Sequence, residues 1–136
     1  MIETDDWHEI NDVLARYCWA VDEGDGEAYA ALWTTDGVLT GLGPARSGSE
    51  ALAGVATGVA KVWGRDMRHL YSNLVCDYAG EGQDQIKAKY YSYVSRYGSH
   101  TGVTGMALCH ATFVRQDGRW KIKANALEMI AAAQPG

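Results

Sequence analysis

The hydrophobic pattern of this chain changes once, near Gly64, and that change constrains the fold more than any other feature. Before Gly64, apolar residues recur at the three- and four-residue spacing of amphipathic helices. After it, they alternate with polar residues, as in half-buried strands. Helices followed by a meander of strands are typical of an α+β fold, in which helices cover one face of a curved antiparallel sheet. The sequence therefore predicts a cone-shaped sheet wrapped around N-terminal helices.

Capping and turn residues set the expected boundaries of these elements. Asp6, with Glu9 three positions later, has the form of a helix capping box, and Gly24 supplies a helix stop. The pair Asp117–Gly118 is typical of a two-residue hairpin turn. We expect helices over 6–23, 27–33 and 49–62, a turn at 34–37, a mobile loop at 96–105, and strands over 38–42, 67–78, 85–97, 106–116 and 119–129.

The length of 136 residues predicts a single domain over residues 1–136. Seventeen acidic against 12 basic residues give a net charge of -5, which argues against a nucleic-acid partner. The three cysteines, Cys18, Cys76 and Cys109, form no CxxC pair and indicate free thiols in a reducing compartment. The N-terminus does not resemble a signal peptide, and no apolar run is long enough to span a bilayer. We therefore expect a cytoplasmic protein that does not bind membranes.

An acid lies at an unusual place in the first helix. The apolar stripe of that helix ends at Val21, and Asp22 follows in the last turn, just before Gly24. Most aspartates beside such a glycine stop are solvated turn residues, so a functional role requires a partner in space. The candidate partner is His69, in the strand expected over 67–78. A lone histidine in a strand is itself more often structural than catalytic.

Strand alternation assigns further residues to the face that carries His69. That face should line the interior of the cone and combine apolar walls with a few polar anchors, as a small-molecule pocket requires. The opposite face is also partly apolar, which predicts that another subunit covers it in a homo-oligomer, a dimer or trimer. The expected pocket-lining residues are Asn73, Tyr90, Ser92, Val94, Arg96 and Cys109.

Motifs for metal and cofactor chemistry are missing from the sequence. There is no HxH or HExxH pattern, no GxSxG elbow, no GxGxxG after a strand, and no P-loop. We therefore expect no metal and no cofactor, which leaves cofactor-free acid–base chemistry if the protein is an enzyme.

Several short motifs together resemble the SnoaL-like branch of the nuclear-transport-factor-like superfamily, whose members have a cystatin-like α+β barrel. The likeness covers nearly the whole chain. It is carried by Arg16–Tyr17, Val21–Asp25, Ala31–Gly37, Ser47–Gly48, Arg68–Asn73 and Asp117–Ile122. This superfamily contains dehydratases, isomerases, cyclases, epoxide hydrolases and non-catalytic binders, so the resemblance implies a fold more specifically than a reaction.

Within this superfamily, Asp22 and His69 resemble the Asp-His dyad of scytalone dehydratase, hexachlorocyclohexane dehydrochlorinase and bile-acid 7α-dehydratase. In those families the aspartate orients the histidine, which abstracts a proton next to a leaving group. Tyr17 matches the helix-one tyrosine of the bile-acid enzyme and of ketosteroid isomerase, whose hydroxyl contacts a substrate oxygen. The resemblance therefore implies that Asp22, His69 and Tyr17 are catalytic.

The sequence also departs from these relatives. Val21 stands where scytalone dehydratase has a tyrosine, and the stretch 38–42 lacks that enzyme's second tyrosine. The acids of ketosteroid isomerase are absent from 38–42 and 106–116, and the arginine–aspartate pair of limonene-epoxide hydrolase is absent from 90–96. These differences weaken the isomerase and hydrolase interpretations and leave elimination.

The leading hypothesis is a cofactor-independent lyase of the dehydratase type that acts on a small hydrophobic substrate, such as a cyclic or polyketide-like molecule. Two alternatives remain open: a polyketide cyclase or isomerase on the same fold, and a small-molecule-binding protein without catalysis. A mass change on turnover distinguishes elimination from isomerisation. An NMR pH titration of His69, in the wild type and in Asp22→Asn, distinguishes an enzyme from a non-catalytic binding protein.

Overall fold

The computed structural model of this chain describes the backbone of residues 1–98 and 102–131 and the side chains of 1–98 and 105–130. The helices are α1 (Thr4–Glu23), α2 (Gly26–Ala30), α3 (Ser49–Trp63) and a single 3-10 turn, η1 (Glu81–Gln83). The strands are β1 (Trp33–Thr40), β2 (Arg46–Ser47), β3 (Met67–Ala79), β4 (Gln85–Arg96), β5 (Gly102–Gln116) and β6 (Arg119–Ala131).

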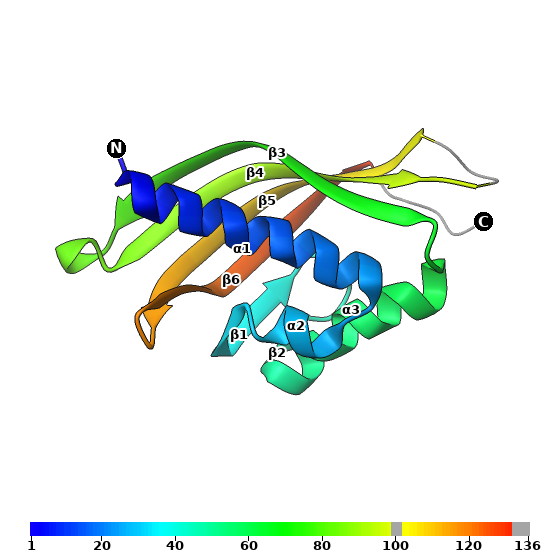
Figure 1. Cartoon of the computed structure of the whole chain (residues 1–136), viewed down its shortest axis with the longest axis horizontal. Helices are drawn as coiled ribbons and strands as arrows, with labels where there is room; N and C mark the ends of the chain where they lie inside the picture. The colour runs from blue at the N-terminus through cyan, green and yellow to red at the C-terminus, as the bar shows by residue number, and fades with distance from the viewer. Residues whose placement is uncertain (99–101, 132–136) are drawn as a thin grey trace.

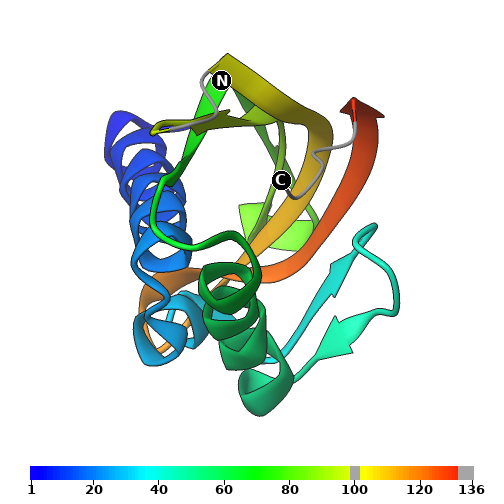
Figure 2. The ribbon, with the colours of Figure 1, turned by 90° about the vertical axis from the view of Figure 1, so that its right-hand side faces the viewer.

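One curved sheet of six strands, in the order β2-β1-β6-β5-β4-β3, holds the fold together. Strands β3 to β6 form the antiparallel meander predicted from the sequence. The sheet is mixed, because β1 pairs with β6 in parallel, and it is not closed. Helix α1 lies along the concave side of the sheet (Figure 1), and α1 and α3 flank the open side of the arc (Figure 2). The predicted α+β fold class is thereby confirmed.

Helix α1 is tied to the sheet by the apolar stripe expected for it. Ile10, Leu14 and Val21 are buried, and the helix ends where Gly24 adopts a left-handed φ of 68° and donates its N–H to the last turn. The helix begins at Thr4, and the predicted capping box at Asp6 does not form. Asp6 instead accepts a hydrogen bond from Trp120 Nε1 at 2.8 Å, because both residues lie where α1 crosses β6.

Two expected connections are strands in the structure. Residues 34–37, predicted to be a turn, belong to β1, because the N–H of Ile122 donates to the carbonyl of Leu32 and draws this segment alongside β6. The loop expected over 96–105 is also shorter than predicted, since Arg96 pairs with Gly102 at the end of the β4–β5 ladder. Residues 99–101 of that expected loop lie outside the described residues.

Strand β3 contains a bulge that exchanges its two faces. Asn73 has a positive φ of 58°, and the pairing with β4 shifts register between Ser72 and Val75. Before the bulge, His69 and Tyr71 share the inner face as predicted; beyond it, Cys76 is buried and Val75 is 45% exposed. The prediction that Asn73 shares the face of His69 and lines a pocket is therefore wrong, since Asn73 is exposed.

The core fills the space between the helices and the concave face of the sheet. Its largest fully buried side chains include Trp120, Tyr29 and Phe113. Burial of an apolar side chain such as Phe113 stabilises the fold by about 1.5–3 kcal/mol relative to exposure. None of the helices within the described ranges is long and apolar enough to cross a membrane.

Candidate active site

Asp22 and His69 meet inside the fold, although 47 residues separate them in the sequence. The last turn of α1 carries Asp22 across the start of β3, where the ring Nδ1 of His69 lies 2.7 Å from Asp22 Oδ1. The backbone N–H of His69 also donates to Oδ1 at 3.0 Å and to Oδ2 at 3.1 Å. The carboxylate is thus held by both the ring and the backbone of one residue.

This contact determines which ring nitrogen of His69 carries the proton in the neutral form. An ionised carboxylate only accepts hydrogen bonds, so Nδ1 carries the hydrogen and Nε2 keeps a lone pair. No residue in the described part of the chain hydrogen-bonds Nε2. The two side chains are 8% (Asp22) and 14% (His69) exposed, which shields the ion pair that forms when the ring gains a proton. The pair can therefore accept a proton at Nε2 and stabilise the resulting imidazolium.

The inner face of β4 follows the sequence prediction. Tyr90 and Arg96 are buried, Ser92 and Val94 are half-buried on the same face, and Val94 is the direct strand partner of His69. On β5, Cys109 is buried opposite Tyr90. Burial raises the pKa of the Cys109 thiol to about 11, so this group is a neutral part of the wall at physiological pH and not a nucleophile.

Arg96 faces the interior but has structural partners. Its Nη2 donates to Asp66 Oδ2 at 3.1 Å, and its Cζ lies 5.6 Å from the centroid of the Trp63 ring. A cation held by a carboxylate and an aromatic face joins the end of α3 to the start of β3. The structure thus places Arg96 beside the predicted site, with Nη2 held by Asp66 and with Nε buried without a hydrogen-bond partner among the described residues.

Tyr17 lies in an aromatic cluster with Tyr29 and Trp33, and no described hydrogen bond joins it to Asp22 or His69. Its ring centroid is 4.9 Å from that of Tyr29 and 6.3 Å from that of Trp33. Burial raises the pKa of the Tyr17, Tyr29 and Tyr90 hydroxyls, which therefore stay protonated and can donate hydrogen bonds. Tyr17 therefore belongs to this aromatic cluster and not to the hydrogen-bonded Asp22–His69 pair.

A buried amide that the sequence analysis missed completes this polar cluster. Asn125, on β6, is 1% exposed, and its Nδ2 donates to the hydroxyl of Tyr90 at 2.8 Å. Within the described residues, Asn125 Oδ1, the hydroxyl of Tyr29 and Trp33 Nε1 are buried without a hydrogen-bond partner. Leaving a polar group unpaired costs about 1–3 kcal/mol. Each of these buried unpaired atoms is therefore an exception to the usual pairing of buried polar groups. The only sequence feature that could have indicated this buried amide is a single asparagine between two alanines in a predicted strand.

The described side chains include no group of three or more residues arranged to hold a metal ion. Asp22 and His69 pair with each other. The other histidines among the described residues lie on the surface: His110 is exposed on β5, and His8 is exposed on the first turns of α1.

The sequence of residues 3–125 matches the SnoaL-like domain. The chain belongs to the SnoaL-like family. This membership confirms the resemblance found in the sequence. No curated protein matches this SnoaL-like chain.

Solved structures similar to this SnoaL-like domain share its cystatin-like fold. A single-residue variant of Rv3472, a protein of unknown function from Mycobacterium tuberculosis, is 28% identical with a TM-score of 0.79, over 89% of this chain and 69% of that one. An NTF2-like protein from Novosphingobium aromaticivorans is 26% identical with a TM-score of 0.82, over 93% and 82% of the two chains. A scytalone dehydratase-like protein from the same organism is 21% identical with a TM-score of 0.75, over 95% and 91%, and this likeness concerns the fold alone.

Proposed function

We propose that this SnoaL-like protein is a cofactor-independent lyase that removes water from a small hydrophobic substrate, such as a cyclic or polyketide-like β-hydroxy ketone. The observation that carries the proposal is the 2.7 Å contact between His69 Nδ1 and Asp22, which leaves Nε2 as a proton acceptor on the inner face of the sheet. Membership of the SnoaL-like family, whose superfamily contains dehydratases, supports the same reaction class.

The proposed reaction needs only one proton carrier. His69 Nε2 takes the proton from the carbon beside the carbonyl, while Asp22 stabilises the imidazolium that forms. The imidazolium then returns the proton to the departing hydroxyl, so that a C–H and a C–O bond break, a C=C bond forms, and water leaves. Over the cycle the ring returns to its neutral form, and no oxidant, metal or cofactor is consumed.

A donor to the substrate carbonyl would lower the barrier further, because negative charge develops on that oxygen as the proton leaves. Tyr17 is the residue proposed for this role, since its hydroxyl stays protonated and lies in the buried cluster with Tyr29. Tyr90, Ser92, Val94 and Cys109 are proposed to form the wall around the substrate.

The test is turnover of cyclic β-hydroxy ketones followed by mass spectrometry. The wild-type protein should yield a product lighter by one water. His69→Gln and Asp22→Asn should each lower the rate by about 100-fold to 10,000-fold, the usual contribution of a positioned general base. His110→Gln, which changes an exposed histidine on β5, should leave the rate unchanged.

The same measurement distinguishes the alternative functions. A product of unchanged mass would replace elimination by cyclisation or isomerisation on the same fold. Ligand binding without any product would identify a non-catalytic binder. Either result, or full activity in His69→Gln, would overturn the proposed elimination.

A further inference from the structure

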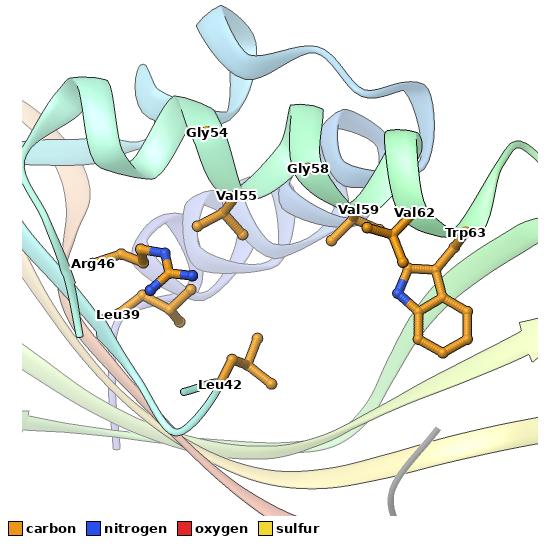
Figure 3. A pocket seen from close by; sticks show the side chains of 9 residues that line it. All are labelled: Leu39, Leu42, Arg46, Gly54, Val55, Gly58, Val59, Val62 and Trp63. Atoms are coloured by element: carbon orange, nitrogen blue, oxygen red, sulfur yellow. The ribbon is translucent and has the colours of Figure 1, made fainter. Parts of the chain in front are cut away.

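A cavity of about 280 Å³ lies between α3 and the strand β1. Figure 3 shows it beneath the inner face of the helix, with Val55, Val59 and Trp63 above and Leu39 and Leu42 below. The volume is just below the range of about 300–1,000 Å³ that small-molecule sites occupy. A molecule with one or two rings fits this space.

The wall of this cavity contains one charge. Of the nine described residues that line it, Arg46 alone is ionised, and the others are apolar or glycine. Its guanidinium extends from β2 toward the space between α3 and the β1–β2 turn (Figure 3). Nη1 donates to the carbonyl of Pro44 at 2.7 Å, and no carboxylate within the described ranges forms a salt bridge with Arg46. In a chain with 17 acidic residues, this arginine faces the cavity with most of its N–H donors unused.

One residue of the cavity wall contacts the strand that pairs with the His69 strand. Trp63, at one end of that wall, packs against Arg96 on the inner face of β4. Arg96 is two residues along β4 from Val94, the strand partner of His69. Neighbouring inward positions on a strand are separated by about 7 Å. Neither Asp22 nor His69 is among the residues that line the cavity, so the cavity forms a site separate from that pair.

We propose that this cavity holds a ligand whose apolar ring carries an anionic oxygen group, and that Arg46 binds that group. The anionic group of the ligand is inferred from the guanidinium. It pairs with a carboxylate through two parallel hydrogen bonds and can also donate to the oxygen of an ionised phenol or enol. The apolar ring of the ligand is inferred from the valine, leucine and tryptophan side chains that line the cavity. Binding of this ligand at Arg46 does not depend on the proposed elimination.

Two glycines on α3 allow the cavity to be filled without disturbing the fold. Gly54 and Gly58 line it, and a Cβ built at either position meets no atom within 4 Å. Both glycines lie inside a helix, where a larger side chain is favoured over glycine. Gly58→Leu should therefore occupy the space and keep α3 intact, and Gly54→Ala is a smaller change of the same kind.

Calorimetric titration with naphthoate and its neutral amide, naphthamide, tests the proposal. The wild-type protein should bind naphthoate at least about tenfold more tightly than naphthamide, as expected for a charge-assisted pair. Arg46→Met should reduce this ratio to within about twofold, because methionine retains the apolar stem but not the charge. Arg46→Lys should restore part of it, and Gly58→Leu should weaken both probes. Arg119→Met, a change of an exposed arginine on β6, is the matched control.

Equal binding of the two probes to the wild type, or a full preference for naphthoate in Arg46→Met, would overturn the proposal. Thermal unfolding shows whether each variant folds, and Gly54→Ala replaces Gly58→Leu if the latter does not. Asp22→Asn should bind naphthoate like the wild type. A naphthoate preference in a protein that dehydrates no substrate would refute the elimination and leave the Arg46 site standing.

Discussion

At the scale of single residues, the function proposed for this protein depends on one carboxylate with two tasks. Asp22 orders the ring of His69 through Nδ1, and it also satisfies the backbone N–H of the same residue at the start of β3. A variant at Asp22 therefore changes both the chemistry of the imidazole and the stability of the α1–β3 contact. Activity alone does not separate these two effects, but the tautomer of His69 does.

Asp22→Ala should change the ring nitrogen that carries the proton. In the wild type, nitrogen NMR of labelled histidine at a pH where the ring is neutral should show hydrogen on Nδ1, held there by Asp22. In the variant the Nε2–H form should predominate, as it does in a free imidazole side chain. The free energy of unfolding should fall by about 1–3 kcal/mol, because a backbone N–H loses its acceptor. Hydrogen on Nε2 in the wild type would contradict the assignment.

At the scale of elements, helix α1 is fastened to the sheet at both ends. Asp22 joins its last turn to β3, and Asp6 joins its first turns to Trp120, Tyr78 and Arg115. Burial acts to raise the pKa of Asp6, but the hydrogen bonds from Tyr78 and Trp120 and the charge of Arg115 outweigh it, so that pKa lies below 3.8. Carboxylates that look like helix caps in the sequence thus bind the strands across the core.

Asp6→Asn should destabilise the protein in a pH-dependent manner. Because the pKa of Asp6 is lower in the folded than in the unfolded state, its contribution is complete above about pH 4 and disappears as pH falls through the folded value. Urea unfolding at pH 7 should show a loss of about 1–3 kcal/mol, from hydrogen bonds to a charged group. The difference between variant and wild type should shrink below about pH 3. A loss that stays constant down to that pH would contradict the argument.

The bulge in β3 makes a separate prediction about Asn73. With a φ of 58°, this position tolerates asparagine or glycine but strains a β-branched residue. Asn73→Val should lower the free energy of unfolding by about 1–2 kcal/mol, whereas Asn73→Gly should stay within about 0.5 kcal/mol of the wild type. Because Asn73 is exposed outside the interior, Asn73→Gly should also retain full activity in the dehydration assay. Chemical unfolding and turnover of the same two variants check both statements.

At the scale of the whole molecule, the convex face of the sheet carries exposed apolar side chains. Leu70 on β3 and Tyr91 on β4 are 39% and 40% exposed there, and Leu108 on β5 lies directly beside Tyr91 in the ladder. Farther along the same face the ladder turns polar, with Lys89 opposite His110. An exposed apolar patch bordered by polar residues is typical of an interface. We propose that two or three copies of the chain associate through this patch.

Tyr91→Glu should shift the protein toward the monomer, because a charge at the centre of an apolar interface loses its hydration without a partner. Light scattering after size-exclusion chromatography measures the mass directly. Lys87→Glu, on the polar part of the same strand face, is the control and should leave the mass unchanged. A wild type that is monomeric at all concentrations would refute the proposed oligomer.

Local patterns in the sequence determined the element types and most of the inner face. The α1 stripe, the glycine stop at Gly24 and the strand alternation that places Tyr90 and Cys109 inside all depend on residues within a few positions of one another. Such short-range patterns can be recognised in the sequence without knowledge of the fold. Family motifs then pointed to Asp22 and His69, which the structure brings within 2.7 Å.

Only the tertiary structure decided where long-range pairing overrides local preference. The parallel pairing of β1 with β6 turned a predicted turn into a strand, and the bulge at Asn73 reversed half of β3. Asn125 and Arg46 look unremarkable in the sequence. Asn125 is significant because it is buried, and Arg46 because it lines a cavity and forms no salt bridge with the described residues. These properties depend on neighbours distant in the chain, and a single sequence carries no record of which distant residues become neighbours.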